Sequence, residues 1–125
     1  MKTMNKKAIN REVKTIDANG RTLGRVATEV AMNLMGKTKA TFERNAYTGF
    51  PVVVVNASKL RITAKKLAEI FHTRYSGIPG GLRVIHGKET AEKEGLKELI
   101  KLATYQMLPD NKIRRQMMKN LTVQD

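Results

Sequence analysis

The residues with the clearest chemical potential are Gly36, Lys37 and Thr38, the trio that closes the phosphate-binding loop of many nucleotide-hydrolysing enzymes. That motif also needs a first glycine five positions earlier and a helix that starts at the lysine, where backbone N–H groups meet the phosphates. Here Ala31 stands at the first position, and a helical pattern precedes the trio. The sequence therefore predicts a helix stop followed by a cation.

Groups that could perform catalysis or hold a metal are sparse. The chain has no cysteine, which excludes disulfides, thiolate zinc sites and cysteine nucleophiles. Its two histidines, His72 and His86, lack the spacing of a metalloprotease site. The acidic residues of "KETAEKEGLKE" alternate with lysines, as on a solvated helix face. We expect no enzyme, no metal site, no cofactor and no small-molecule substrate.

The charge balance indicates the partner. Lys and Arg total 24 against 11 acidic residues, which gives a net charge of +13. Nucleic acid is the favoured counterpart, because each phosphate that a cation neutralises releases counterions. An anionic membrane would call for a basic amphipathic helix with Trp or Phe on its apolar face, and the chain has no Trp. With no apolar signal core at the N-terminus, the sequence predicts a cytoplasmic protein without a membrane partner.

One helix is evident from periodicity. In "TLGRVATEVAMNLM" the apolar residues recur at helical spacing and form one stripe. Thr22 suits the N-cap, and Gly36 suits the left-handed residue after the last turn. We therefore expect a helix that lies on a core and ends at Gly36.

The remaining pattern alternates strands with helices. Strands are predicted over Val13–Asp17, over Pro51–Asn56 and over Ala68–Tyr75, with a short helical turn possible between the last two. A helix is expected over "LKELIKLATYQML", then a short one capped by Asn111, then "LTV" as an edge strand. The prediction is an α/β fold whose mainly parallel sheet is covered on both faces. Residues 1–12 are predicted to be a basic arm, and residues 13–125 one domain.

Basic residues stand near the ends of most expected elements. Any single one is best read as a solvated surface cation, but the core cannot hold them, so together they must form a basic surface. The candidates for RNA binding are Arg21, Arg25, Lys37, Lys39, Arg44, Lys65, Lys66, Arg74, Arg83, Lys112, Arg114, Arg115 and Lys119.

The most specific candidate is the loop "RYSGIPGGLR", Arg74–Arg83. Gly77, Gly80 and Gly81 lack side chains, so ribose or phosphate could approach the backbone closely. Tyr75 offers a face on which a base could stack. The alternative is an ordinary turn, although the flanking arginines favour RNA. A small nucleotide-dependent enzyme acting on RNA and a free-standing RNA- or DNA-binding regulator also remain open.

Several motifs together resemble one family. "IDANGRTLGRVATEVAMNLMGKTKATF", "VVVVNASKLRITAKKL", "RYSGIPGGL" and "MLPDNKIRRQMMKNLTV" look like the bacterial large-subunit ribosomal protein thirteen (L-thirteen) family, from about Val13 to Val123. The resemblance implies a three-layer α/β/α domain with a mostly parallel, four-stranded sheet. It also implies a structural, non-enzymatic protein that binds large-subunit ribosomal RNA, supports early subunit assembly and lies beside other large-subunit proteins.

The resemblance also marks positions that would face RNA. They are Arg25, Lys37, Lys39, Arg74, Ser76, Gly77, Gly80, Gly81, Asn111 and Arg115. The chain departs from the family pattern at Phe50, where an aspartate is usual, and at Tyr75, where a histidine is usual. These departures bear on local turns and leave the expected fold unchanged.

Overall fold

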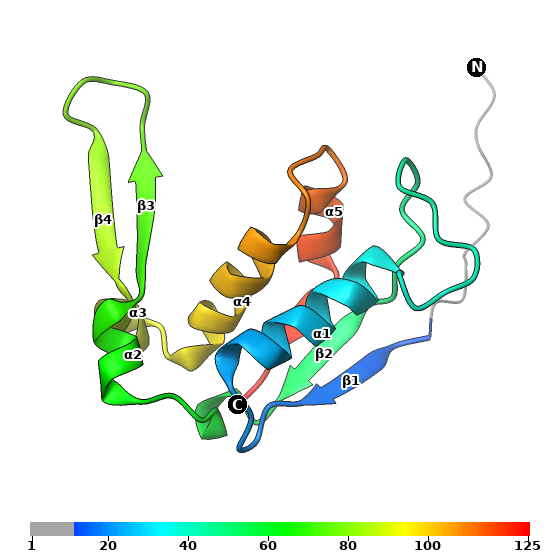
Figure 1. Cartoon of the computed structure of the whole chain (residues 1–125), viewed down its shortest axis with the longest axis horizontal. Helices are drawn as coiled ribbons and strands as arrows, with labels where there is room; N and C mark the ends of the chain where they lie inside the picture. Colours follow the sequence, from blue (N-terminus) through cyan, green and yellow to red (C-terminus); the bar gives the residue numbers. More distant parts are fainter. Residues whose placement is uncertain (1–11) are drawn as a thin grey trace.

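Residues 12–125 form two parts, a helix-backed sheet and a hairpin that stands away from it (Figure 1). The computed structural model describes this range, so the predicted arm over residues 1–12 lies outside it except for Glu12. The elements are β1 (Lys14–Asp17), α1 (Leu23–Met35), β2 (Val52–Val55), the 3-10 turn η1 (Ala57–Lys59), α2 (Ala64–Glu69), β3 (Phe71–Tyr75), β4 (Leu82–His86), α3 (Gly87–Lys93), α4 (Leu96–Met107), α5 (Arg114–Lys119) and β5 (Leu121–Val123).

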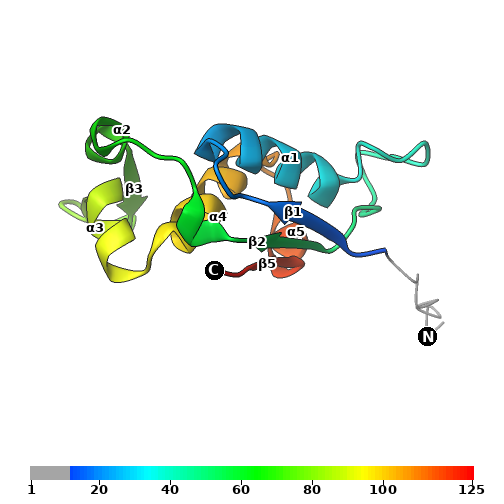
Figure 2. The same ribbon diagram turned by 90° about the horizontal axis from the view of Figure 1, so that it is seen from below.

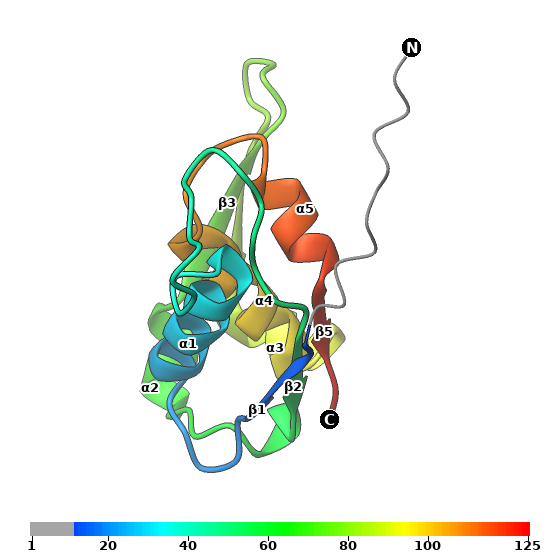
Figure 3. The same ribbon diagram turned by 90° about the vertical axis from the view of Figure 1, so that its right-hand side faces the viewer.

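The sheet is parallel, with the strand order β1-β2-β5. Ile16, Val54 and Val123 lie in register and are buried. On the other face Thr15 and Thr122 flank Val53 and are exposed. Helices α1 and α4 lie on the same side of the strands (Figures 2 and 3). Helices α1 and α4 therefore cover one face of the sheet, whereas α2 and α3 lie at the base of the hairpin.

These observations confirm the mixed α/β class and correct its details. The parallel sheet of residues 12–125 has three strands, and neither the four-stranded sheet nor the three-layer arrangement is found there. The third expected strand, β3, pairs antiparallel with β4 instead. The β3–β4 pairing closes only a short turn. Closing a short loop costs less entropy than closing the longer one that would bring β3 to the parallel sheet.

Helix α1 forms as its periodicity predicts. Val26, Val30 and Leu34 share its inner stripe and are fully buried. Thr22 occupies the N-cap position, although its side chain makes no capping bond. Gly36 ends the helix with φ +78°, and its N–H donates to the carbonyl oxygens of the last turn. The Gly-Lys-Thr trio thus follows a helix, and the predicted helix stop is confirmed.

Helix α4 packs across α1 and completes the core. Leu99, Ile100 and Thr104 are fully buried, and the Thr104 hydroxyl donates to the Ile100 carbonyl at 2.8 Å. The helix ends before Pro109, as the sequence predicts. A short connection, residues 108–113, leads to α5 and then to the edge strand β5, which confirms both of these predictions.

The predicted secondary structure differs most from the structure in and around the hairpin. Ala68 and Glu69, expected in a strand, belong to α2, which confirms the short helical turn that the sequence left open. Strand β4 and helix α3 were not predicted as elements. The signal for β4 was present, because Leu82 and Val84 alternate with Arg83 directly after the glycine-rich turn.

Candidate nucleic-acid-binding surface

Three loops project from one edge of the molecule (Figure 1). They are the β3–β4 turn (residues 76–81), the α4–α5 connection (residues 108–113) and the loop between α1 and β2 (residues 36–51). Helices α1 and α4 end at this edge. Ligands of open α/β sheets usually bind at the opposite edge, outside the carboxyl ends of the strands. The amino-end edge, defined by these three loops, instead collects most of the expected RNA-binding residues.

Cations on or beside these loops lack internal partners. Within residues 12–125, no carboxylate forms an ion pair with Lys37, Arg44, Arg74, Arg83, Lys112, Arg115 or Lys119. An unpaired surface cation keeps its full charge for an external anion. The amino-end edge is therefore a positively charged surface whose charge the fold does not neutralise.

Other predicted cations are already engaged. Arg21 pairs with Glu29 at 2.6 Å, and Lys65 lies 3.9 Å from Glu69. Arg114 contacts Asp110 at 2.9 Å and lies 3.9 Å from the centre of the Tyr105 ring. The last contact ties α5 to α4, so the guanidinium of Arg114 has a structural role in addition to any external one.

Four candidates lie away from the amino-end edge. Arg21 and Arg25 flank the start of α1, and Lys65 and Lys66 belong to α2. In Figure 1 both segments lie at the far side of the molecule from the three loops. The fold thus separates the predicted RNA-binding residues into a large group at the amino-end edge and a small group of four on the far side. One short RNA segment could not contact both groups.

Lys39 is turned toward its own loop. Its ammonium group donates to the Thr48 carbonyl at 2.8 Å and lies 3.9 Å from the centre of the Phe50 ring. The Phe50 N–H in turn donates to the Asn33 carbonyl at 3.0 Å, which fastens the loop to the end of α1. Lys39 therefore shapes the loop that presents Lys37 and Arg44.

A groove of about 610 Å³ runs between the hairpin and α4. Arg74 lines it from β3, and Arg115 and Lys119 line it from α5. Burial lowers the pKa of His72, which also lines the groove, so this imidazole is neutral at pH 7. Residues far apart in sequence thus place three of the predicted cations around one space, which Glu98 also lines.

Several residues that line this groove are not among those predicted from the sequence. Lys101 and Tyr105 of α4 also line it. They stand four positions apart, so they share one helix face, and their i, i+4 spacing was the signal available from the sequence. Both groups are partly engaged within the protein, because Lys101 lies 3.7 Å from Glu98 and the Arg114 guanidinium lies 3.9 Å from the centre of the Tyr105 ring.

The hairpin has two chemically distinct faces. Arg74 and Arg83 lie opposite each other in the ladder, and Tyr75 lies opposite Leu82. Neighbouring residues of a strand point to opposite faces, so the tyrosine does not share the face of the arginines. The hairpin face that carries Tyr75 also carries Phe71, and these two side chains are 65% and 59% exposed. This apolar hairpin face, formed by Phe71, Tyr75, Leu82 and Val84, carries no lysine or arginine.

The glycines of the turn have an internal explanation. Gly77 and Gly80 adopt φ values of +84° and +80°, which L side chains rarely adopt. A side chain at Gly81 would meet Ser76. The Gly81 N–H donates to the Ile78 carbonyl at 2.9 Å. The turn needs these glycines whether or not RNA approaches, so the RNA contacts expected at residues 76–81 stay predictions.

Other functions receive no support from the described part of the chain. Residues 12–125 hold no group of three or more side chains suited to a metal ion. Among the same residues, no helix has both the length and the apolar character to cross a bilayer.

An α/β fold that gathers unneutralised cations on one edge is typical of a nucleic-acid-binding protein. Comparison with known proteins is more specific. Residues 11–124 match the family described as Ribosomal protein L13. The chain belongs to this family, whose members are structural proteins and not enzymes. The family resemblance and the expectation of a non-enzyme are thereby confirmed.

Individual relatives agree with this assignment. The chain is 41% identical over 122 residues to the large ribosomal subunit protein uL13 of Geobacter sulfurreducens, covering 98% of this chain and 85% of the relative. It is 44% identical over 115 residues to the protein of the same name from Natranaerobius thermophilus, with 92% and 80% covered. The uL13 protein of Aliivibrio fischeri is 39% identical over 116 residues, with 93% and 81% covered.

Proposed function

We propose that this protein is a structural constituent of the large ribosomal subunit, where it binds large-subunit ribosomal RNA and supports early subunit assembly. The observation that carries the proposal is the match of residues 11–124 to the L13 family, together with relatives that are named large ribosomal subunit proteins. Its place in the cell would then be the ribosome, in the cytoplasm.

The amino-end edge is the proposed RNA contact. Cations on or beside its three loops form no ion pair among residues 12–125, and phosphate contacts supply much of the affinity of proteins for nucleic acid. Arg74, Arg115 and Lys119 surround one groove, so they would engage a single stretch of RNA backbone. Lys37 and Arg44 would engage a second stretch beside the end of α1.

The cations away from this edge have a smaller proposed part. Arg25 and Lys66 have no ion pair among residues 12–125, so they remain available to a different RNA segment. Arg21 and Lys65 share their charge with a glutamate. We expect these four residues to add long-range attraction and little positional information.

Neighbouring large-subunit proteins are the proposed second kind of partner. The apolar hairpin face supports this, because Phe71, Tyr75, Leu82 and Val84 are each at least half exposed. Contiguous exposed apolar groups are uncommon on monomeric proteins and mark contact sites. A face without lysine or arginine, in a chain of net charge +13, suits a protein better than a polyanion.

Sucrose-gradient sedimentation of a cell lysate tests the proposal. The tagged full chain should sediment with large subunits and assembly intermediates, and a wash in high salt should release it. A double variant, Arg74→Glu with Arg115→Glu, should shift to the top of the gradient, whereas Lys65→Glu with Lys66→Glu should not. A wild-type chain that stays at the top with short RNAs would instead favour a free-standing regulator.

A further inference from the structure

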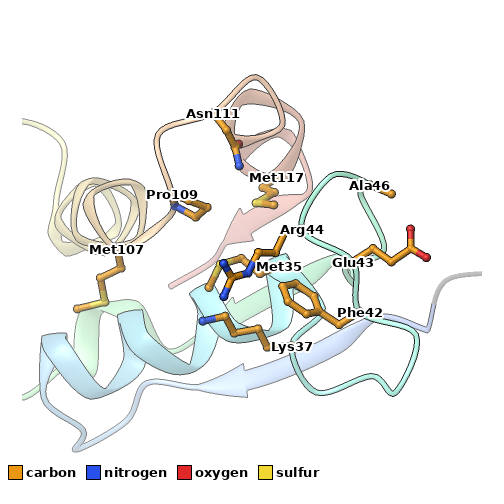
Figure 4. A pocket seen from close by; sticks show the side chains of 10 residues that line it. All are labelled: Met35, Lys37, Phe42, Glu43, Arg44, Ala46, Met107, Pro109, Asn111 and Met117. Atoms are coloured by element: carbon orange, nitrogen blue, oxygen red, sulfur yellow. The ribbon is translucent and has the colours of Figure 1, made fainter.

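A separate pocket of about 390 Å³ lies at the amino-end edge, where three segments meet (Figure 4). Its walls come from the end of α1, from the following loop and from the α4–α5 connection with α5. Pockets that hold small organic groups usually occupy roughly 300 to 1,000 Å³. The space therefore has the volume for one planar group of nucleobase size.

The inner wall of this pocket is apolar and deformable. Met35 and Met117 are 9% and 5% exposed, and Phe42 lies beside them, whereas Met107 lines the outer side of the pocket and is 43% exposed. The Met107 sulfur lies 3.5 Å from the Thr28 hydroxyl, whose proton is donated to the Gly24 carbonyl oxygen at 2.8 Å. Thioether groups adapt to flat rings and make favourable contacts with them. The wall suits the face of an aromatic ring.

Asn111 supplies a directed donor. Its side-chain oxygen accepts from the backbone N–H groups of Ile113 and Arg114, at 3.1 and 3.0 Å. Two N–H donors at one end fix the orientation of the amide, because its nitrogen cannot accept there. The amide nitrogen has no partner among residues 12–125 and points into the pocket (Figure 4).

The charges at the rim are positive. Lys37 and Arg44 line the pocket and form no ion pair among the described residues. The carboxylate of Glu43 is directed away from the other lining side chains (Figure 4). An occupant should therefore combine an apolar planar face, hydrogen-bond acceptors on its edge and a nearby negative charge.

We propose that this pocket receives one unstacked RNA base, with its carbonyl oxygen on the Asn111 amide and its phosphate on Lys37 and Arg44. The inference rests on the proposed RNA binding and adds a position at which an unpaired base is read. A paired base cannot enter, because its faces are covered by the stack. Uracil suits the donors of the rim, whereas the amino group of adenine would meet another donor.

Two RNA hairpins that differ by one bulged uridine test the proposal. Fluorescence anisotropy with the full chain should show about 5-fold tighter binding of the bulged hairpin than of the fully paired one. A hairpin with a bulged adenosine should bind more weakly than the uridine form. In methyl spectra, Met35, Met107 and Met117 should shift on binding the bulged uridine, while Met32 should not.

Asn111→Asp is the decisive variant. An aspartate still caps α5, but it faces the base carbonyl with an oxygen, so the preference for bulged uridine should fall below about 2-fold. Asn45→Asp introduces the same charge on the neighbouring loop, residues 36–51, without lining the pocket, and it should weaken both hairpins equally. Circular dichroism verifies that both variants are folded.

The outcomes separate this inference from the function on which it rests. Equal binding of the paired and bulged hairpins by the wild type, or unchanged methionine methyls, would overturn the base pocket and leave general RNA binding intact. An unchanged preference in Asn111→Asp would also overturn it. If the wild type binds no hairpin at moderate salt, the proposed RNA binding fails, and the pocket assignment fails with it.

Discussion

Arg74 and Arg83 lie directly opposite each other on β3 and β4, and neither forms an ion pair within residues 12–125. Like charges at opposed positions of an antiparallel pair are destabilising. The hairpin therefore holds two cations together without a direct ion pair, although Glu89, Glu94 and Glu98 line the same cavity as the two arginines. A bound polyanion would remove this repulsion, which makes the pair a marker of the RNA-facing side.

Replacing Arg74 with glutamine should separate stability from binding. The unfolding temperature should stay equal or rise slightly, because the repulsion disappears. RNA affinity should fall, and the slope of log K against log salt should lose about 0.7 to 0.9 for the lost phosphate contact. Lys66→Gln, with the same charge change on α2, is the control and should alter the slope less. An unchanged slope in Arg74→Gln would remove this residue from the contact.

Lys39 and Lys37 should behave differently although they stand two residues apart. Lys39→Ala removes the bond to the Thr48 carbonyl and the contact with Phe50, and it should lower the free energy of unfolding by about 1 to 2 kcal/mol. Lys37→Ala should change that free energy by less than about 0.5 kcal/mol and weaken RNA binding. Urea denaturation and anisotropy measure the two effects. Equal stability losses would contradict the structural role of Lys39.

Gly49 should tolerate no side chain. A Cβ there would overlap the Leu34 carbonyl group at the end of α1, and Gly49→Ala should destabilise the protein by at least about 3 kcal/mol. Gly24 is the matched control, because a Cβ on it meets nothing within 4 Å, and Gly24→Ala should stabilise α1 by about 0.5 kcal/mol. Thermal unfolding distinguishes the two. A mild effect at Gly49 would mean that residues 36–51 do not pack on α1.

Asp17 should contribute stability only above acidic pH. The Asn56 side chain donates to its carboxylate at 3.0 Å and the Asn19 N–H at 2.9 Å, and these bonds lower the pKa of Asp17 below its ordinary value of 3.8. A carboxyl group whose folded pKa is lowered stabilises the fold above its unfolded pKa and loses this effect as pH falls through the folded pKa.

Asp17→Asn should therefore be less stable than the wild type at pH 7, and the difference should fade below pH 3.8. Thermal unfolding monitored by circular dichroism at pH 7, 5 and 3 measures it. Glu43→Gln is the control, since Glu43 has no ion pair among residues 12–125. A difference that persists unchanged at pH 3 would show that the carboxylate charge is not responsible.

The sequence by itself determined the features that depend on neighbouring residues. The apolar period of residues 23–35 defines α1, because helical hydrogen bonds and a buried stripe involve residues three and four apart. Gly36 as the helix stop, and Asn111 as the acceptor for the Ile113 and Arg114 N–H groups at the start of α5, follow from local backbone chemistry. The total charge is additive, so the preference for a polyanion also required no structure.

Only the tertiary structure decided which strands pair and which cations are free. β3 joins β4 and not the parallel sheet, and the sheet carries helices of residues 12–125 on one face. Arg21 is neutralised by Glu29, and Lys39 turns inward, whereas Arg115 forms no ion pair among residues 12–125. An ion pair or a pocket depends on distances between segments remote in sequence. Packing sets those distances, and the residue types alone do not encode them.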